Sequence, residues 1–392
     1  MVKWPIEKLG TLCEIKTGRK DVNQGNPEGK YPFFTCAKEH TYSDDYSFDG
    51  EALLIAGNGD VGNTTYYNGK FEAYQRTYVL MNFDRVNPRY LFRILDGLLK
   101  RTLYDQKLGN TMPYIKKGML ENYPIILPPL SMQKRIVAIL DEAFAGIDTA
   151  IANTDRNLAN ARELFESYLS SVFTRRGDGW EDKTLGEIAG FKNGLNFNKH
   201  SNGQTLPVIG VGDFQKNQYV PIKNLGLATI DGTLDTSYEV KKDDILTVRS
   251  NGSKELIGRC MLVPEVEEQT SFSGFVIRIR FDTARIVPKF LLWFMKSNAT
   301  VKQLTREGGG ANINNINQKK LSALPVSYPS SPGEQLEMAQ KLDELSLELE
   351  RLESIYQQKL NSLIELKQSL LQKAISGELP TEGDKLMDEA VA

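Results

Sequence analysis

The strongest pattern of apolar positions lies in two long segments, residues 131–176 and 333–378. In the first, apolar residues recur at alternating spacings of four and three over more than four heptads, with only Thr154 polar. Each stripe predicts one long helix, about 65 Å at about 1.5 Å per residue. The helices most simply pair as an antiparallel two-helix coiled coil; the alternative is that each packs only on its own domain. The positions expected at the helix-pair interface are Leu140, Phe144, Ile147, Ile151, Leu158, Phe165, Leu342, Leu345, Leu349, Leu352, Tyr356, Leu363 and Leu370.

The segment before each long helix alternates short apolar runs with Gly, Asn and Pro, which is typical of strands and hairpins. Pro88 and Pro288 each open a helical pattern. The fold class predicted is α/β, in the form of mixed α+β globular domains joined by long α-helices. The predicted order is a globular domain (1–130), a helix (131–176), a second globular domain (177–332), a helix (333–378) and a flexible tail (379–392). Candidate strands are Ala52–Ala56, Tyr78–Phe83, Asp243–Val248 and Phe275–Phe281.

The chain also repeats itself. The segment Trp4–Gly10 returns as Trp180–Gly186, 176 positions later, and the offset rises to 200 at Pro88 and Pro288. From Gln133/Gln335 to Ser167/Ser369 the offset is a constant 202. The two helices are therefore held to a common length while the globular halves have diverged, which predicts two related modules and a pseudo-twofold internal repeat.

The composition is that of a globular protein. With 392 residues and 40% apolar side chains, the chain is long enough for two or more cores. No run approaches the roughly 18 apolar residues that span a membrane, and the first residues show no signal-peptide pattern. Three scattered cysteines, Cys13, Cys36 and Cys260, fit a reducing compartment, so a cytoplasmic location is expected.

The net charge of −2 is unevenly distributed. Residues 331–392 hold 6 Lys/Arg and 13 Asp/Glu, a net of −7, so the rest of the chain carries +5. A basic excess in the globular halves is a mild indication of an anionic partner. Random surface charge explains it about as well.

Motifs for catalysis are lacking. Gly57–Gly62 imitates a dinucleotide-binding fingerprint, but that motif needs a following helix, and Asn63–Gly69 has the composition of a strand and a turn. The second copy has no third glycine in register, so a hairpin turn is predicted. His40 and His200 are far apart in the sequence, and there is no P-loop. We therefore predict no catalytic residues, no metal site and no cofactor in this chain.

Basic and amide side chains instead recur in corresponding loops of both copies. Lys and backbone N–H groups suit phosphates, whereas Arg, Asn and Gln suit base edges. The segments Tyr74–Thr77 and Ser271–Gly274 precede equivalent strands, and Lys107–Ile115 matches Arg306–Asn317. Solvated loops are the alternative, but duplicated loops with different side chains suggest two readers with different targets. The candidate DNA-binding residues are Lys16, Thr17, Arg19, Lys20, Asn58, Gln75, Arg76, Asn110, Lys192, Asn193, Lys199, Arg249, Asn251, Ser273, Arg306, Asn312 and Asn314.

The helix ends carry the most specific resemblance. Arg162–Phe173, Leu366–Leu379, the two Trp-x(4)-Leu-Gly openings and the Pro-Pro-Leu-x(2)-Gln start of the first helix (Pro128–Gln133) resemble conserved regions of type I restriction-modification specificity subunits. The start of the second helix, Pro329–Gln335, departs by one extra residue. The resemblance covers essentially the whole chain.

This resemblance implies a non-catalytic subunit with two target-recognition domains, each reading one half of a bipartite site in double-stranded DNA. The helices would set the spacing and dock two methyltransferase (modification) subunits, and restriction (motor-nuclease) subunits would join them. S-adenosylmethionine, ATP and Mg would belong to those partners. The alternatives are a self-contained restriction enzyme or DNA methyltransferase fragment, and a coiled-coil adaptor that touches no DNA.

Overall fold

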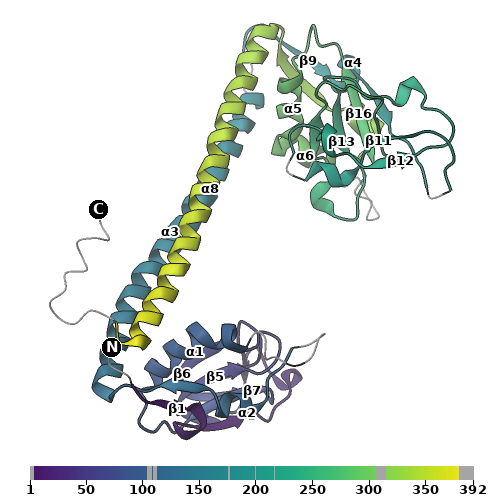
Figure 1. The fold of residues 1–392 in the computed structure, drawn as a ribbon. Coiled ribbons are helices and arrows are strands. Elements are labelled where there is room, and N and C mark those ends of the chain that lie inside the picture. The colour runs from purple at the N-terminus through teal and green to yellow at the C-terminus, as the bar shows by residue number, and fades with distance from the viewer. Residues whose placement is uncertain are drawn as a thin grey trace. The chain divides into compact units, whose positions relative to one another are not determined.

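The computed structural model describes residues 4–103, 108, 113–174, 177–198, 200–215, 217–305 and 315–378. The chain divides into two compact units (Figure 1). Unit 1 comprises Met1–Asp155 and Gln357–Ala392, and unit 2 comprises Arg156–Tyr356. The long helices α3 (Leu130–Thr174) and α8 (Pro332–Ser376) both cross the boundary. Each unit therefore contains one globular domain and a portion of both helices.

Unit 1 is built on a mixed sheet. Its described strands are β1 (Ile6–Lys8), β2 (Glu14–Thr17), β3 (Tyr31–Phe34), β4 (Thr41–Ser43), β5 (Phe48–Ala56), β6 (Thr64–Ala73), β7 (Thr77–Met81) and β8 (Pro124–Ile126). The strand order is β2-β7-β5-β6-β3-β4, and β1 pairs separately with β8. Most of β6 pairs antiparallel with β5, whereas its last residues pair parallel with β3 at Phe33↔Glu72. One long strand thus joins the two parts of the sheet.

Unit 2 repeats this topology with the long strand divided in two. Its described strands are β9 (Trp180–Thr184), β10 (Ala189–Asn193), β11 (Thr205–Ile209), β12 (Leu227–Thr229), β13 (Ile245–Val248), β14 (Cys260–Leu262), β15 (Ser271–Phe272), β16 (Val276–Phe281) and β17 (Pro325–Pro329). The order β10-β16-β13-β14 matches β2-β7-β5-β6, and β15-β11-β12 matches β6-β3-β4. Residues 263–270 separate two pieces that are continuous in unit 1.

Short helices pack against these sheets. A proline opens both α1 and α5, where its missing N–H costs nothing, as the sequence predicts. None of the helices in the described ranges combines the length and apolarity needed to span a membrane. The α-helices are α1 (Pro88–Leu103), α2 (Lys117–Glu121), α4 (Leu185–Ile188), α5 (Pro288–Lys296), α6 (Asn298–Thr305) and α7 (Gln318–Ser322). The 3-10 turns are η1 (Leu9–Thr11), η2 (Val22–Gln24), η3 (Val211–Phe214), η4 (Ile222–Asn224), η5 (Thr236–Tyr238) and η6 (Lys254–Leu256).

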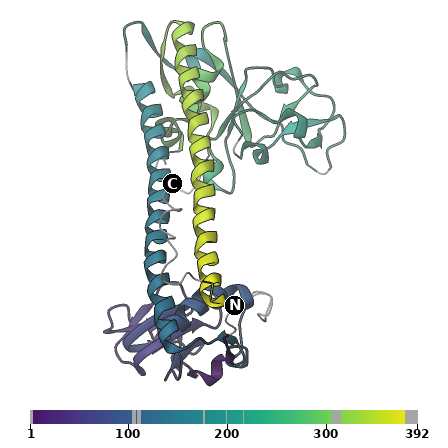
Figure 2. The ribbon, with the colours of Figure 1, turned by 60° about the vertical axis from the view of Figure 1, so that its left-hand side comes forward.

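In unit 1 the first part of α3 and the last part of α8 lie side by side and run antiparallel (Figure 2). Leu140 and Phe144 of α3 are buried in one core with Leu371 of α8 and with α1. Farther along the pair, Lys367 Nζ lies 2.8 Å from Asp148 Oδ1. The apolar stripe therefore buries the helices against each other and against the domain at the same time.

Unit 2 contains the opposite ends of the same helices, again antiparallel. Leu169 of α3 is buried with Ala339 and Leu342 of α8 and with the domain core. An ion pair joins Arg162 Nε to Glu353 Oε1 at 2.6 Å. Both units thus bury the helices through the stripe that the sequence shows.

The predicted fold class is confirmed, and the structure refines the helix-pair interface. Leu352 is 39% exposed, and it is the neighbouring Glu353 that faces α3, where it pairs with Arg162. Near the end of α8, Leu371, Ala374 and Ile375 are more deeply buried than the expected Leu370, because α8 packs there on the domain as well as on α3. Of the other expected positions, Leu140, Phe144, Ile147 and Leu342 are buried, and Ile151, Leu158, Phe165, Leu345, Leu349, Tyr356, Leu363 and Leu370 are half-buried.

A fully buried glutamine ties the start of α3 to the domain of unit 1. The side-chain amide of Gln133 donates from Nε2 to Pro128 O (2.8 Å) and to Arg85 O (3.2 Å). Its Oε1 accepts a hydrogen bond from the N–H of Asn87 at 2.7 Å. Three backbone groups, one buried and two partly buried, are satisfied by this one side chain.

Gln335 makes the same three hydrogen bonds at the start of α8 in unit 2. Its Nε2 donates to Pro329 O (2.8 Å) and to Arg285 O (3.0 Å), and its Oε1 accepts from Val287 N–H (2.8 Å). The extra residue before Gln335 leaves these contacts unchanged. We call Gln133 and Gln335 the two glutamine joints.

Candidate nucleic-acid interface

Loops from distant parts of unit 1 meet where several strands of its sheet end. Backbone hydrogen bonds hold these loops together. The N–H of Gly18, just after β2, donates to Thr77 O (3.3 Å), and the N–H of Gln75 donates to Lys20 O (3.0 Å). A Cβ built at Gly18 would lie 1.8 Å from Ala73 O. Only glycine allows these two loops to approach so closely.

The hairpin between β5 and β6 lies at the same end of the sheet. Gly57 N–H donates to Arg76 O (2.9 Å), and Ile115 N–H donates to Gly57 O (2.9 Å). Gly62 adopts φ +82°, a conformation that favours glycine, and donates to Ala56 O (2.9 Å). A strand follows, so the predicted hairpin is confirmed. We call the set formed by residues 18–20, 57–62, 74–77 and 115 the loop edge of unit 1.

The same bonds recur in unit 2. Gly194 N–H donates to Val276 O (3.0 Å), and Arg249 N–H donates to Phe275 O (2.9 Å). Ile316 N–H donates to Arg249 O (2.9 Å). Residues 194–196, 249–258, 273–276 and 316 therefore form the loop edge of unit 2, with the same backbone frame as in unit 1.

These bonds establish which residues correspond in the two units. The turn Tyr74–Thr77 is closed by a backbone bond of 2.8 Å between its ends, and the turn Ser273–Val276 by one of 2.9 Å. The segment Ser271–Gly274 does precede β16, the strand equivalent to β7, but the residues that match Tyr74–Thr77 one by one lie two positions later, because Ser271 and Phe272 form β15. Arg76 in unit 1 therefore corresponds to Phe275 in unit 2.

A glycine of the hairpin also has a counterpart that the sequence comparison missed. Gly258 N–H donates to Val248 O (2.9 Å) and has φ +84°, so it takes the place of Gly62. The loop runs over residues 249–258 in unit 2 and over residues 57–62 in unit 1, four residues fewer. The insertion shifts the glycine out of sequence register while its backbone role is kept.

Polar side chains cover the loop edge of unit 1. Gln75 Nε2 donates to Asp21 Oδ2 at 3.1 Å. Lys16 pairs with Glu14 on the same strand at 2.8 Å, an exposed ion pair of the kind that contributes little stability. The side chains of Gln75 and Lys16 remain accessible to a partner. The exposed candidates in this unit are Lys16, Thr17, Arg19, Gln75 and Arg76.

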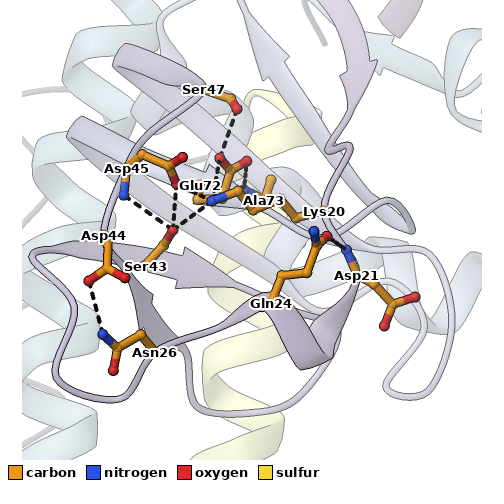
Figure 3. Close-up of polar contacts among 10 residues, drawn as sticks. All are labelled: Lys20, Asp21, Gln24, Asn26, Ser43, Asp44, Asp45, Ser47, Glu72 and Ala73. Atoms are coloured by element: carbon orange, nitrogen blue, oxygen red, sulfur yellow. Dashed lines mark hydrogen bonds and ion pairs between the residues drawn. The ribbon is translucent and has the colours of Figure 1, made fainter.

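Lys20 lies among these loops but is engaged inside the domain (Figure 3). Its ammonium pairs with Asp45, donates to Ser43 Oγ (2.9 Å) and lies 3.8 Å from Glu72 Oε2. The Glu72 side chain is 1% exposed and also accepts a hydrogen bond from Ser47 Oγ at 2.7 Å. The hydrogen bond from Lys20 holds the pKa of the Asp45 carboxyl below its usual value. Lys20 therefore neutralises a buried carboxylate, which leaves its ammonium less free for the expected phosphate contact.

The loop edge of unit 2 is less polar at its surface. Lys192 Nζ lies 4.2 Å from the centre of the Tyr238 ring, a cation–π contact. Asn193 Oδ1 and Arg249 Nε are buried without a hydrogen-bond partner in the described part of the chain. Among the remaining candidates, Asn58 and Ser273 are buried and Asn251 is half-buried. Asn110, Lys199, Arg306, Asn312 and Asn314 lie outside the described residues.

Two arginines of β16 brace the sheet of unit 2. Arg280 forms a bidentate pair with Asp244, both bonds at 2.6 Å, and Asp244 is 1% exposed. Arg278 Nη1 donates to Ser237 O (3.0 Å) and Glu239 O (2.8 Å), and burial lowers the pKa of its guanidinium. In the described ranges, no group of three or more His, Cys, Asp and Glu side chains is placed to hold a metal ion.

The family profile described as "Type I restriction modification DNA specificity domain" matches residues 1–157 and 177–361. These ranges contain both loop edges and both glutamine joints. The chain belongs to this family. The resemblance seen at the helix ends is therefore confirmed over most of the sequence.

Individual relatives extend the match over nearly the full chain. The EcoDI specificity subunit of Escherichia coli is 28% identical over 417 residues, covering 97% of this chain and 90% of that protein. The StySPI specificity subunit of Salmonella potsdam is 26% identical over 314 residues, covering 76% and 66%.

Solved structures share the fold. One was solved in a study of the complex assembly and conformational transition of the type I R-M system. It has 18% identity and a TM-score of 0.74, covering 96% of this chain and 98% of the other. The HsdS subunit from Thermoanaerobacter tengcongensis has 17% identity and a TM-score of 0.54, covering 96% and 97%.

Proposed function

We propose that this chain is the non-catalytic subunit that gives a type I restriction-modification complex its DNA sequence specificity. Each globular domain reads one half of a bipartite site in double-stranded DNA. Helices α3 and α8 hold the two domains at a set spacing and dock two methyltransferase subunits, and restriction subunits bind that core. S-adenosylmethionine, ATP and Mg act in those partners.

The observation that carries the proposal is the loop edge, built twice on one backbone frame with different side chains. A rigid scaffold with variable side chains is what two recognition sites of different specificity require. In unit 1 the frame presents Arg19, Gln75 and Arg76 to solvent, groups that suit phosphates and base edges. In unit 2 it presents Phe275 and the half-buried Asn251.

The helices leave apolar surface uncovered, which supports their role as a docking platform. Unit 2 exposes 73% of Leu164, 66% of Leu347 and 47% of Ile355 on α3 and α8. Unit 1 exposes 49% of Ile364 and 47% of Leu366 on α8. Five large apolar side chains exposed on the same two helices favour a surface that a partner covers.

Methyl transfer tests the division of labour. We expect purified chain with labelled S-adenosylmethionine and DNA to transfer no methyl groups until its methyltransferase subunits are added. Methylome sequencing of cells that express the complete system should then give two specified half-sites separated by an unspecified gap. Methyl transfer by the chain alone would identify a self-contained methyltransferase instead. A complex that binds no DNA even at low salt would indicate an adaptor.

The spacing role has its own test. Seven residues, one heptad, are inserted after Thr154 in α3 and after Tyr356 in α8, the equivalent places in the two helices. The insertion keeps the apolar stripe in phase and lengthens each helix by about 10 Å. The unspecified DNA between the two half-sites should then grow by about three base pairs, since each base pair spans about 3.4 Å. Both half-sites should be unchanged. An altered half-site with an unchanged gap would refute the spacing role.

A further inference from the structure

The equivalent turns of the two loop edges present opposite chemistry at one position. Arg76 of unit 1 is exposed, and its backbone oxygen accepts a hydrogen bond from Gly57. Phe275 of unit 2 is 59% exposed, and its backbone oxygen accepts the equivalent bond from Arg249. The backbone is therefore the same in both turns, and the side chain at this position is the variable part.

Phe275 contributes little to the core of its own unit. Its ring belongs to none of the apolar clusters of unit 2 and stacks on no other ring in the described part of the chain. The turn that carries it is nevertheless held in place by backbone hydrogen bonds, since Ser273 N–H donates to Ile209 O (2.9 Å) and Gly274 N–H donates to Leu195 O (2.7 Å). A turn held in this way that keeps an aromatic ring in water indicates that the ring contacts a partner.

The partner that fits both turns is the major groove of DNA. There guanine presents two acceptors, O6 and N7, which match a guanidinium in bidentate fashion. Thymine presents its C5-methyl group, the apolar feature that a phenyl ring can cover. One backbone position can therefore read a G·C pair or an A·T pair according to its side chain.

Resting on the proposed function, we infer that Arg76 and Phe275 are equivalent base-reading residues. Arg76 donates to O6 and N7 of a guanine in one half-site. Phe275 packs against the methyl group of a thymine in the other. Both halves of the site are thus read from the same turn, one by hydrogen bonds and one by apolar contact.

Removing a single methyl group from the DNA tests the role of Phe275. The probe is a duplex that carries the site defined by the methylome, with each thymine of the second half-site replaced in turn by deoxyuridine, which lacks only the methyl group. Equilibrium binding of the complete methyltransferase complex should fall about fourfold at one of these positions. The Phe275→Ala complex should bind the thymine duplex about fourfold more weakly and show no response to deoxyuridine there.

A matched variant separates this role from a general loss of apolar surface. Leu227 on β12 is 71% exposed in the same unit. The Leu227→Ala complex should keep both the affinity and the response to deoxyuridine. The inference is overturned if no deoxyuridine position weakens the wild-type complex, or if Phe275→Ala keeps the full response. If Phe275→Ala alters the bending of the DNA but keeps the response to deoxyuridine, the ring acts as a wedge between base pairs. That result would also overturn the inference.

The same design applies to Arg76, with 7-deazaguanine replacing each guanine of the first half-site and so removing the N7 acceptor. Binding should fall at least about fivefold at one position, and Arg76→Ala should abolish that difference. Arg101, an exposed arginine on α1, supplies the control Arg101→Ala. A wild-type complex that binds no DNA would refute the proposed function itself. A complex that binds its site normally but ignores all these base changes would refute only this inference.

Discussion

Gln133 and Gln335 make the same three hydrogen bonds in their two units. Arg76 and Phe275 also occupy equivalent positions, but they have in common only the hydrogen bond that each backbone oxygen accepts, and their side chains differ. The first pair sits where a long helix meets its domain, and the second sits at a loop edge. The duplicated module has therefore kept its joints and exchanged its outward-facing side chains. Stability should depend equally on corresponding joints, and binding should depend unequally on corresponding loop residues.

The largest loss of stability is expected at the glutamine joints. Gln133→Leu and Gln335→Leu each leave one buried and two partly buried backbone groups without a partner, at about 1–3 kcal/mol for each group that is fully buried, partly offset by the added apolar burial. We expect each to lower the free energy of unfolding by about 4 kcal/mol, measured by denaturant unfolding. Gln368→Leu, on an exposed position of α8, is the control. Unequal losses in the two variants would show that the joints are not equivalent.

The next effect concerns the close approach of loops at Gly18 and Gly194. A Cβ at Gly18 would lie 1.8 Å from Ala73 O, and one at Gly194 would lie 2.2 Å from Ser273 O. Alanine at either position forces the backbone apart, which we expect to cost about 3 kcal/mol, somewhat more at Gly18. Hydrogen exchange would locate the opened loops. Gly118→Ala and Gly252→Ala, which meet nothing within 4 Å, should leave exchange unchanged.

A smaller effect distinguishes a structural lysine from a contact lysine. Lys20→Met leaves the carboxylate of Glu72 buried without its cation, so we expect unit 1 to lose about 2 kcal/mol of stability. The salt dependence of DNA binding should not change, because the Lys20 ammonium already faces carboxylates. A reduced salt dependence of binding with unchanged stability would show instead that Lys20 contacts a DNA phosphate.

The smallest change in stability is expected for Lys16→Met, since the pair with Glu14 is exposed. Loss of one phosphate contact should lower DNA affinity equally for all sequences. It should also reduce the slope of log affinity against log salt by about 1, measured by binding titrations at several salt concentrations. An unchanged slope would exclude Lys16 from the interface.

Much of the architecture is predictable from the sequence, because the long helices carry a periodic stripe that needs no tertiary information. The hairpin at Gly57–Gly62 is predictable from the strand composition that follows it. The outward turn of Leu352 is not, because it depends on which face of α8 meets Arg162 across the pair. Local spacing cannot determine that rotation.

The loop edges are harder to predict than the helices. Residue type alone does not show that the match to Tyr74–Thr77 lies two positions after Ser271–Gly274, because only the backbone bonds reveal that β15 ends before the turn. Phe275 appears in the sequence as the start of an apolar strand, and nothing local shows that its ring faces water. Lys20 appears as one more basic loop residue, because its carboxylate partners come from β6 and from the segment after β4.

The division of unit 1 into two sequence segments has a consequence for synthesis. Its core includes Leu371, Ala374 and Ile375, which the ribosome makes more than 200 residues after Ile147 of the same core. At roughly 5–20 residues per second, the apolar face of the first half of α3 stays uncovered by α8 for tens of seconds, while the continuous unit 2 can fold as it emerges. A nascent chain that stalls before α8 is complete therefore exposes a ready-made binding site for chaperones, or for the helix of another copy.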